Sequence, residues 1–365
     1  MTRPKLLISA FNCSPNRGSE DEVGYQWILG HLNKNKFQIF VLTEERYKSY
    51  LKELIANKNL NFIFHTIKLI NISKVKSNFI LRLYYYIWQL TAYFKIKKEF
   101  GINYFNIIHH VTWGSMRWPI LLSNLKSVFI IGPIGGGVDT PSNLFKGFTI
   151  WQIIVEKMRT VNNRIINLSP LVNQMFKNSA IVYAANLETK QIILKKYHPK
   201  VQIMSVVGLG NQDVFNNQNK EKKLKIVFLG RLIYWKGIYM ILDILNKIDK
   251  SIKYKMFFIG EGNELNKILS FKKKFPNIDI EIKSINNKRV IKFLSDKDIL
   301  LFPSYRESGG LAILEAIKAG VKVICLDLGG PKLLVDENNG YKINIENKSF
   351  FEISNEIAKM INHLK

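Results

Sequence analysis

One pattern recurs along both halves of the chain: a short apolar run, a loop rich in glycine or polar residues, and then a segment with helical periodicity. In the first half the apolar runs are 6–10, 37–42, 105–108 and 128–131. In the second half they are 224–229, 255–259, 278–282, 299–302 and 321–325. Short apolar runs that alternate with helices are typical of buried parallel strands. The sequence therefore predicts an α/β protein with two doubly wound, Rossmann-like domains.

A polar stretch near the middle, residues 210–223, separates the two series of strands. A length of 365 residues fits two domains of roughly 100–200 residues each. We expect an N-terminal domain over residues 1–209, a linker over 210–223 and a C-terminal domain over 224–347. A final helix over 348–365 could pack back on the N-terminal domain. Ligands of open α/β sheets bind beyond the carboxyl ends of the strands, so the loops that follow strands should carry the chemistry.

Composition excludes several classes of protein. Hydrophobic residues make up 47% of the chain, which is enough for sizeable cores and argues against disorder. The two cysteines, Cys13 and Cys325, lie far apart and outside any zinc-ligand spacing, so neither a disulfide framework nor a structural zinc site is expected. The start of the chain lacks the apolar core of a signal peptide, and no spanning helix is expected. A cytoplasmic location is predicted.

The net charge of +26 attracts anions such as nucleotides, nucleic acid or an acidic membrane surface. A chain rich in Lys, Asn and Ile could owe this charge to an AT-rich genome, so the charge by itself names no partner. The aromatic segment 79–98 has basic ends. It is predicted either to dock against the first sheet or to attach the protein peripherally to the inner face of the cell membrane.

The most informative loop follows the strand at 299–302 and contains Glu307, Gly309, Gly310 and Glu315. The two glycines open a helix, whose free backbone N–H groups form an anion site. The two carboxylates are eight residues apart, so they can bracket an elongated ligand with its phosphate between them. The structural alternative is a glycine-capped helix with two solvated glutamates.

A second loop, Phe228-Leu-Gly-Arg-Leu-Ile-Tyr-Trp-Lys-Gly237, follows the first strand of the C-terminal half. Arg231 and Lys236 place two cations between a strand end and the next helix. An Arg fork and a Lys point charge suit a diphosphate, although solvated loop charges would need no such explanation.

Together these segments resemble the GT-B glycosyltransferases known as group 1, or family 4. The resemblance covers most of residues 224–343. It rests on Glu307-x7-Glu315 after Phe302-Pro-Ser, on the pairs Gly230-Arg231 and Lys236-Gly237, and on Asp327-Leu-Gly-Gly-Pro331. It implies two Rossmann-like domains that face each other across a cleft. It also implies that donor-binding residues are Gly18, Ser19, Arg231, Lys236, Glu307, Ser308, Gly309, Gly310, Leu311 and Glu315.

The first half resembles the family more loosely. The loop after the first strand has a single Gly18, followed by Ser19 and Glu20, where a Gly-Gly form is commoner, and it is similar to a subgroup associated with bacterial surface polysaccharides. The family often has a His at the end of a later strand that contacts the donor sugar. His109 is the first candidate and His110 the alternative, and either could instead be a structural histidine.

Two groups of glycines and one pair of aspartates can be interpreted as functional or as purely structural. The run Gly132-Pro-Ile-Gly-Gly-Gly137, with Gly135 and Gly136, could line the acceptor side together with Glu20 and His110, or could be a flexible turn. Gly260-Glu-Gly-Asn263 could approach the nucleotide or form a tight turn. Asp296-Lys-Asp298 mimics a metal motif, but capping is the favoured interpretation.

The resemblance implies transfer of a hexose from a UDP- or GDP-linked sugar to a glycan or lipid-linked glycan, in lipopolysaccharide or capsule synthesis. Transfer would occur with retention and without a metal or other cofactor, with Glu307, His109, Arg231 and Lys236 as catalytic residues. The departing diphosphate then requires fixed cations and helix-end N–H groups. A GT-B-like sugar-nucleotide epimerase is the enzymatic alternative. A basic nucleic-acid-binding protein is the other alternative, but no binding motif for nucleic acid is present, so nucleic acid is not expected as a partner.

Overall fold

The computed structural model describes residues 3–15, 19–68, 77–205 and 223–364. Internal contacts divide the chain into an N-terminal unit, Met1–Gly137 with Asn163–Gly208, and a C-terminal unit, Val138–Asn162 with Leu209–Lys365. Gly18 and nearly all of the predicted linker 210–223 lie outside the described residues. Within the described part of the chain, no helix is both long enough and apolar enough to span a bilayer.

The N-terminal unit contains a seven-stranded parallel sheet in the order β3-β2-β1-β4-β5-β6-β7. Its strands are β1 (Lys5–Ser9), β2 (Gln38–Glu44), β3 (Leu60–His65), β4 (Ile107–His110), β5 (Val128–Ile134), β6 (Ser179–Ala184) and β7 (Val201–Ile203). The chain reverses its direction across the sheet between β1 and β4, which are neighbours. In a doubly wound sheet this reversal is the point where ligands bind.

The C-terminal unit repeats the arrangement with a six-stranded parallel sheet in the order β10-β9-β8-β11-β12-β13. Its strands are β8 (Leu224–Leu229), β9 (Tyr254–Ile259), β10 (Asp279–Lys283), β11 (Ile299–Phe302), β12 (Lys322–Leu326) and β13 (Gly340–Ile343). The reversal lies between β8 and β11, which pair at Ile226–Ile299 and Val227–Leu300. The two Rossmann-like sheets expected from the sequence are therefore confirmed.

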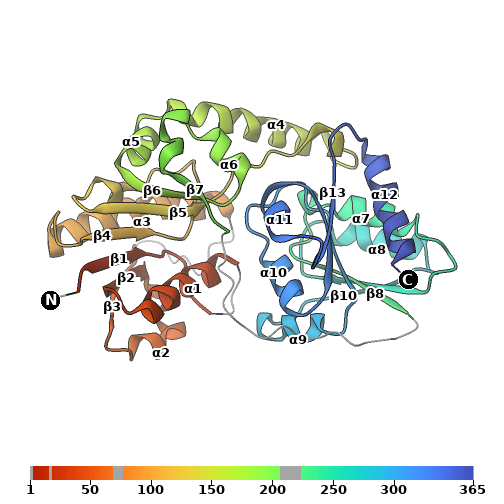
Figure 1. Ribbon diagram of the computed structural model, residues 1–365, viewed down its shortest axis with the longest axis horizontal. Coiled ribbons are helices and arrows are strands. Elements are labelled where there is room, and N and C mark those ends of the chain that lie inside the picture. The colour runs from red at the N-terminus through yellow and green to blue at the C-terminus, as the bar shows by residue number, and fades with distance from the viewer. Residues whose placement is uncertain (1–2, 16–18, 69–76, 206–222, 365) are drawn as a thin grey trace. The chain divides into compact units, whose positions relative to one another are not determined.

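Helices cover both faces of each sheet (Figure 1). They are α1 (Ser19–Lys34), α2 (Lys52–Ile55), α3 (Asn78–Phe100), α4 (Ile150–Ile165), α5 (Pro170–Asn178), α6 (Leu187–Ile192), α7 (Ile238–Leu245), α8 (Leu265–Lys274), α9 (Val290–Leu294), α10 (Leu311–Lys318), α11 (Gly329–Leu334) and α12 (Phe350–His363). In the N-terminal unit α3 and α5 pack on one face of the sheet, and α1 and α2 pack on the other. Helix α3 buries Tyr84, Tyr85 and Trp88, so docking against the first sheet explains these three aromatic residues.

The division of the chain differs from the predicted one in residues 138–162, which belong to the C-terminal unit rather than to residues 1–209. Leu144 is part of the hydrophobic core of that unit, and the side chain of Asn143 donates to the carbonyl oxygens of Ile345 (3.0 Å) and Lys348 (2.7 Å). Helix α12 packs on α7 of the same unit through a hydrogen bond from Ser354 to Asp243 (2.6 Å). Its predicted return to the N-terminal domain stays a prediction.

Candidate donor-binding site

The loops that follow β8 and β11 meet at the reversal point of the C-terminal sheet. The β8 loop continues into a short 3-10 helix, Tyr234–Lys236, and the β11 loop contains residues 303–310. The backbone N–H of Tyr305 donates to the carbonyl oxygen of Trp235 at 2.9 Å. Since neighbouring parallel strands end at the same edge, the two most informative sequence segments lie side by side.

The centre of this site is an ion pair between Lys236 Nζ and the Glu307 carboxylate. Both side chains are largely buried, with 13% and 18% of their surface exposed. The ammonium of Lys236 also lies 4.9 Å from the centre of the Phe302 ring. A cation and a carboxylate thus occupy one partly desolvated position, where charges interact more strongly than at an open surface.

Glycines allow the backbones around this pair to approach closely. Gly237 has a φ of +77°, and a Cβ at this position would overlap the carbonyl oxygen of Pro303. Gly310 adopts a left-handed conformation with a φ of +95° as the N-cap of α10. The backbone N–H of Gly330 donates to the carbonyl oxygen of Glu307 at 2.8 Å, which fixes the loop that presents this carboxylate. The backbones around the ion pair are therefore closely packed.

The remaining predicted residues of this unit surround the pair at various depths. Ser308 and Gly309 are half-buried between Glu307 and the start of α10, where Leu311 is the first residue. Arg231 is exposed, with its guanidinium 6.0 Å from the ring of Trp235. Glu315 is half-buried on α10, about one turn from its start. The structure thus brings Lys236 and Glu307 into contact and leaves Arg231 at the surface of the site.

The glycines at 260 and 262 pack against the loop that contains Arg231, and their approach to a nucleotide stays a prediction. A Cβ on Gly260 would overlap the carbonyl oxygen of Gly230, and one on Gly262 would overlap that of Leu232. The N–H of Leu232 in turn donates to the carbonyl oxygen of Glu261 at 2.8 Å. The close backbone approach expected here is therefore made by the Arg231 loop.

Sequence reasoning missed a buried carboxylate, Glu156 of α4, whose side chain is 1% exposed. It accepts hydrogen bonds from Thr140 Oγ1 (2.7 Å) and Tyr234 OH (2.8 Å), and it forms an ion pair with Arg306 Nη2 (3.0 Å). The Arg306 guanidinium also stacks on Trp235 at 4.1 Å. Burial and the Glu156 charge raise the pKa of Tyr234 to about 12. Glu156 thus holds Arg306, which precedes Glu307, and Tyr234, two residues before Lys236.

No sequence signal identified Glu156, because its partners lie far from it in the chain. The helical periodicity of α4 does place Glu156 and Asn163, seven residues apart, on one face, and this polar face could have drawn attention to Glu156.

In the N-terminal unit, His109 and His110 are both buried at the end of β4, on opposite faces of the sheet. His109 Nε2 is 3.0 Å from the carbonyl oxygen of Gly132, and its Nδ1 is 3.4 Å from His31 Nε2. His110 Nδ1 is 3.0 Å from Ser9 Oγ, and its Nε2 is 3.1 Å from Tyr85 OH. Burial lowers the pKa of each ring to about 3.

These contacts favour the structural alternative for both histidines, since all four ring nitrogens already have partners inside this unit. A contact between His109 and a donor sugar would have to replace one of them. That contact stays a prediction.

The glycine run at 132–137 packs against its own unit. Arg117 Nη2 donates to the carbonyl oxygen of Gly136 at 2.6 Å, and the N–H of Gly135 donates to the carbonyl oxygen of Gly114 at 2.8 Å. A Cβ on Gly137 would overlap the backbone of Thr189. These glycines therefore allow close internal packing, and their role on the acceptor side is untested.

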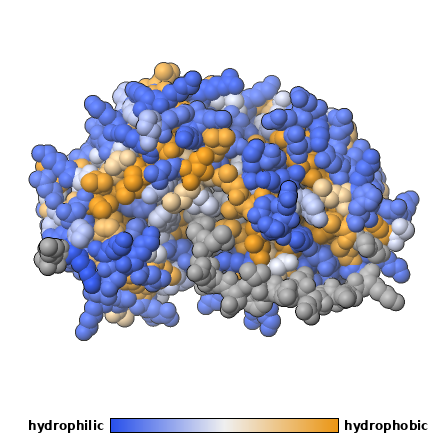
Figure 2. Space-filling model, viewed as in Figure 1, coloured by the Kyte–Doolittle hydropathy of each residue, from blue (hydrophilic) through white to orange (hydrophobic). Residues whose placement is uncertain are grey.

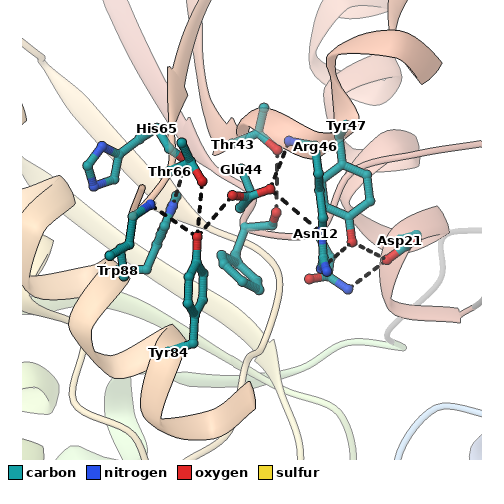
Figure 3. Close-up of polar contacts among 12 residues, drawn as sticks. Asn12, Asp21, Thr43, Glu44, Arg46, Tyr47, His65, Thr66, Tyr84 and Trp88 are labelled. Carbon is teal, nitrogen blue, oxygen red and sulfur yellow. Dashed lines mark hydrogen bonds and ion pairs between the residues drawn. The ribbon is translucent and has the colours of Figure 1, made fainter. Parts of the chain in front are cut away.

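A polar cluster lies beyond the carboxyl ends of β1 and β2 (Figure 3). The Glu44 carboxylate, 1% exposed, accepts hydrogen bonds from Tyr84 OH (3.0 Å) and from the backbone N–H of Arg46 (2.8 Å). Asp21 Oδ1 accepts from Asn12 Nδ2 (2.6 Å) and Tyr47 OH (3.0 Å). This cluster anchors both ends of the loop that contains Gly18.

The residue pair that follows Gly18 begins the next helix. Ser19 is the first residue of α1, and Glu20 accepts a hydrogen bond from the backbone N–H of Trp113 at 3.3 Å. Trp113 Nε1 also donates to Asn12 Oδ1 at 3.0 Å. The predicted acceptor-side residue Glu20 is thus held by the loop after β4, on the same edge of the sheet.

The Asp296–Asp298 motif has structural partners. Asp298 Oδ2 accepts from the backbone N–H of Lys225 at 2.7 Å, and Asp296 forms ion pairs with Lys297 and with Lys225, the latter at 3.4 Å. The contacts of these aspartates are structural, but Asp298 binds the backbone of strand β8 and does not cap a helix. Among the described residues, no three His, Cys, Asp or Glu side chains come together as a metal site would require.

This arrangement of loops is matched by a known family. Residues 211–363 match the family model of the group 1 glycosyl transferases. The matched region holds the complete C-terminal sheet and every group 1 motif predicted from the sequence. It covers less than half of the chain.

Two relatives show how far the sequence similarity extends. The uncharacterized glycosyltransferase MJ1069 of Methanocaldococcus jannaschii is 25% identical over 202 residues, which are 51% of this chain and 50% of that protein. The capsular polysaccharide biosynthesis glycosyltransferase CapM of Staphylococcus aureus is 23% identical over 277 residues, 68% of this chain and 71% of that protein. The similarity to MJ1069 thus spans half of its length.

Solved structures extend the likeness to the whole chain. The lipopolysaccharide outer core galactosyltransferase WaaB superposes with a TM-score of 0.62 and 12% identity, over 99% of this chain and 90% of that one. Alr3699/HepE of Anabaena, in complex with UDP and glucose, superposes with a TM-score of 0.58 and 12% identity, over 99% and 89%. Both units therefore have the GT-B fold that the sequence predicted.

Proposed function

We propose that the protein is a family 4 glycosyltransferase that moves a hexose from a UDP- or GDP-linked sugar to a glycan or lipid-linked glycan. The observation that carries this proposal is the Lys236–Glu307 ion pair beside the glycine-started helix α10, at the reversal point of the C-terminal sheet. The family match of residues 211–363 and the name of CapM support a role in surface polysaccharide synthesis, such as that of capsule or lipopolysaccharide.

The two residues of the pair suit adjoining parts of such a donor, the diphosphate and the sugar. Lys236 and the exposed Arg231 would bind the diphosphate, together with the free backbone N–H groups at the start of α10. Glu307 would accept hydrogen bonds from sugar hydroxyls, and Glu315 from those of the ribose. Since Lys236 and Glu307 neutralise each other in this structure, donor binding would exchange one ion pair for two sets of charge-assisted hydrogen bonds. Because HepE was solved in complex with UDP, UDP-linked sugars are the first donors to test.

The proposed step is a front-face displacement with retention. The bond from the anomeric carbon to the diphosphate oxygen breaks, and a bond to the acceptor hydroxyl oxygen forms on the same face. The acceptor proton passes to the departing diphosphate, whose new charge is stabilised by Lys236, Arg231 and the α10 N-terminus. These groups supply the positive charge that a metal ion provides in other transferases, so we propose a metal-independent reaction.

The test is sugar transfer from UDP- and GDP-hexoses to a panel of lipid-linked glycans, in EDTA. Glu307→Gln and Lys236→Met should each lower transfer at least tenfold, which corresponds to about 1.4 kcal/mol or more of transition-state stabilisation. Glu337→Gln, an exposed position of the same unit, should leave the rate unchanged. The anomeric configuration of the product reports retention directly.

Folded Glu307→Gln and Lys236→Met proteins that transfer sugar at the wild-type rate would contradict these assignments. Conversion of the donor in the absence of any acceptor would instead indicate the epimerase alternative.

A further inference from the structure

Helix α4 has its polar face turned inward. Glu156 and Asn163 are fully buried, and Arg159 donates to the carbonyl oxygen of Val138 at 2.7 Å. Asn163 Oδ1 accepts a hydrogen bond from Arg117. A surface helix normally buries its apolar stripe and exposes its polar face. In α4 the buried face is instead held by hydrogen bonds and ion pairs.

The apolar residues of α4 are correspondingly exposed. Trp151 is 71% exposed and Met158 64%, and both exceed the exposure of most apolar residues in this protein. On the face of the molecule shown in Figure 2, apolar residues lie in patches among the hydrophilic ones. We define the α4 stripe as Ile150, Trp151, Ile154, Met158, Val161 and Ile165, each at least 41% exposed.

These residues form one continuous strip, because positions three and four apart lie on the same side of a helix. Lys157 and Arg164, seven residues apart, are exposed along one edge of the strip. None of the exposed residues of α4 is acidic, since Glu156 points inward. The outer face of α4 thus combines an apolar strip, a tryptophan and a basic edge.

We propose that the α4 stripe docks on an anionic lipid surface. An interfacial helix buries an apolar face among acyl chains while its cations remain among the headgroups, and Trp favours this boundary. The charge of the edge complements anionic lipids, as does the net charge of +26. This inference goes beyond the proposed function, because lipid binding by α4 requires no donor, acceptor or transfer.

The sequence pointed to another helix for such attachment, α3, which buries Tyr84, Tyr85 and Trp88. Two exposed apolar residues of α3, Leu83 (51%) and Phe94 (56%), provide a matched control. The test measures co-sedimentation of the full chain with vesicles of phosphatidylcholine alone or with roughly one third phosphatidylglycerol. The proteins are the wild type, Trp151→Ser/Met158→Ser and Leu83→Ser/Phe94→Ser. Circular dichroism and light scattering report the fold and oligomeric state of each.

We expect the wild type to bind the anionic vesicles, with weaker binding to neutral vesicles and at high salt. The α4 variant should lose at least about tenfold in partitioning, while the α3 variant stays close to wild type. Three results would overturn the proposal: no binding by the wild type, equal binding by the α4 variant, or a loss confined to the α3 variant. The proposal would also be overturned if the wild type were a dimer and the α4 variant a monomer, because the stripe would then bind a second copy of the chain.

Discussion

Removal of the Glu156 carboxylate should weaken the C-terminal unit more than any surface substitution. Glu156 is 1% exposed and binds Thr140, Tyr234 and Arg306. In Glu156→Ala the guanidinium of Arg306, itself only 17% exposed, would lose its counter-charge. The two hydroxyls would lose their acceptor. The perturbation therefore leaves one buried charge and two buried donors without partners.

The expected magnitude follows from these contacts. Removal of one partner of a buried ion pair costs about 3–5 kcal/mol, because the other charge stays desolvated. Glu156→Gln keeps the shape and one acceptor oxygen but removes the charge. It should cost about 1–2 kcal/mol, the difference between charged and neutral hydrogen bonds. If the ion pair is the main term, Arg306→Met should add little in the Glu156→Ala background.

The assay is urea denaturation read by hydrogen exchange of peptides from the C-terminal unit, so that its opening is measured separately from that of the other unit. Glu261→Ala, at an exposed position of the same unit, is the control and should change the free energy of unfolding by less than about 0.5 kcal/mol. Equal effects of Glu156→Ala and Glu261→Ala would refute the reasoning, as would a near-zero coupling energy between Glu156 and Arg306.

Two further predictions test the site and the N-terminal sheet. Gly237→Ala should cost at least about 1 kcal/mol by urea denaturation, because a Cβ at a φ of +77° would overlap Pro303, whereas Gly30→Ala, with open space in α1, should be neutral or stabilising. Stability should fall as pH drops from about 6.5 toward 3, because the folded-state pKa of His110 is lowered to about 3, so the unfolded chain binds the extra proton in this window. The slope is up to about 1.4 kcal/mol per pH unit for each such ring; His110→Asn should reduce it and His363→Gln, at an exposed position, should not. An unchanged slope in His110→Asn, or full stability of Gly237→Ala, would contradict the respective account.

The sequence identified the strands that coincide with its nine predicted runs and missed four others among the described residues. All nine predicted runs are strands, with bounds within a few residues. Strands β3, β6, β7 and β13 were not predicted. β7 has three residues with two exposed, and β13 has four that include a glycine, so neither forms a recognisable apolar run. Their pairing in the sheet, a tertiary effect, defines them.

The position of the candidate donor-side loops was predictable because they follow two neighbouring strands. Glu307, Gly309 and Gly310 follow one strand, and Lys236 follows its neighbour in the sheet. The rule that parallel strands end at one edge therefore brings them together. The ion pair itself was not predicted, since spacing gives no information on which side chains touch.

Contacts between distant segments account for what was missed. Glu156 is separated by 150 residues from Arg306, and no periodicity links them. The inverted amphipathicity of α4 likewise depends on which face meets the C-terminal unit. His109 and His110 were predicted from their place at a strand end, yet their burial follows from side chains of α1 and α3, His31 and Tyr85.

Calorimetric titration with UDP-, GDP- and ADP-sugars, in EDTA throughout, tests the central claim that the C-terminal loops bind a nucleotide sugar. The account predicts metal-independent binding of one nucleotide class by the wild type. Arg231→Ala should weaken this binding at least tenfold, or about 1.4 kcal/mol. Arg289→Ala, which removes an exposed arginine from the same unit, should not. Equal affinity in Arg231→Ala and the wild type, or no binding of any of the three classes, would contradict it.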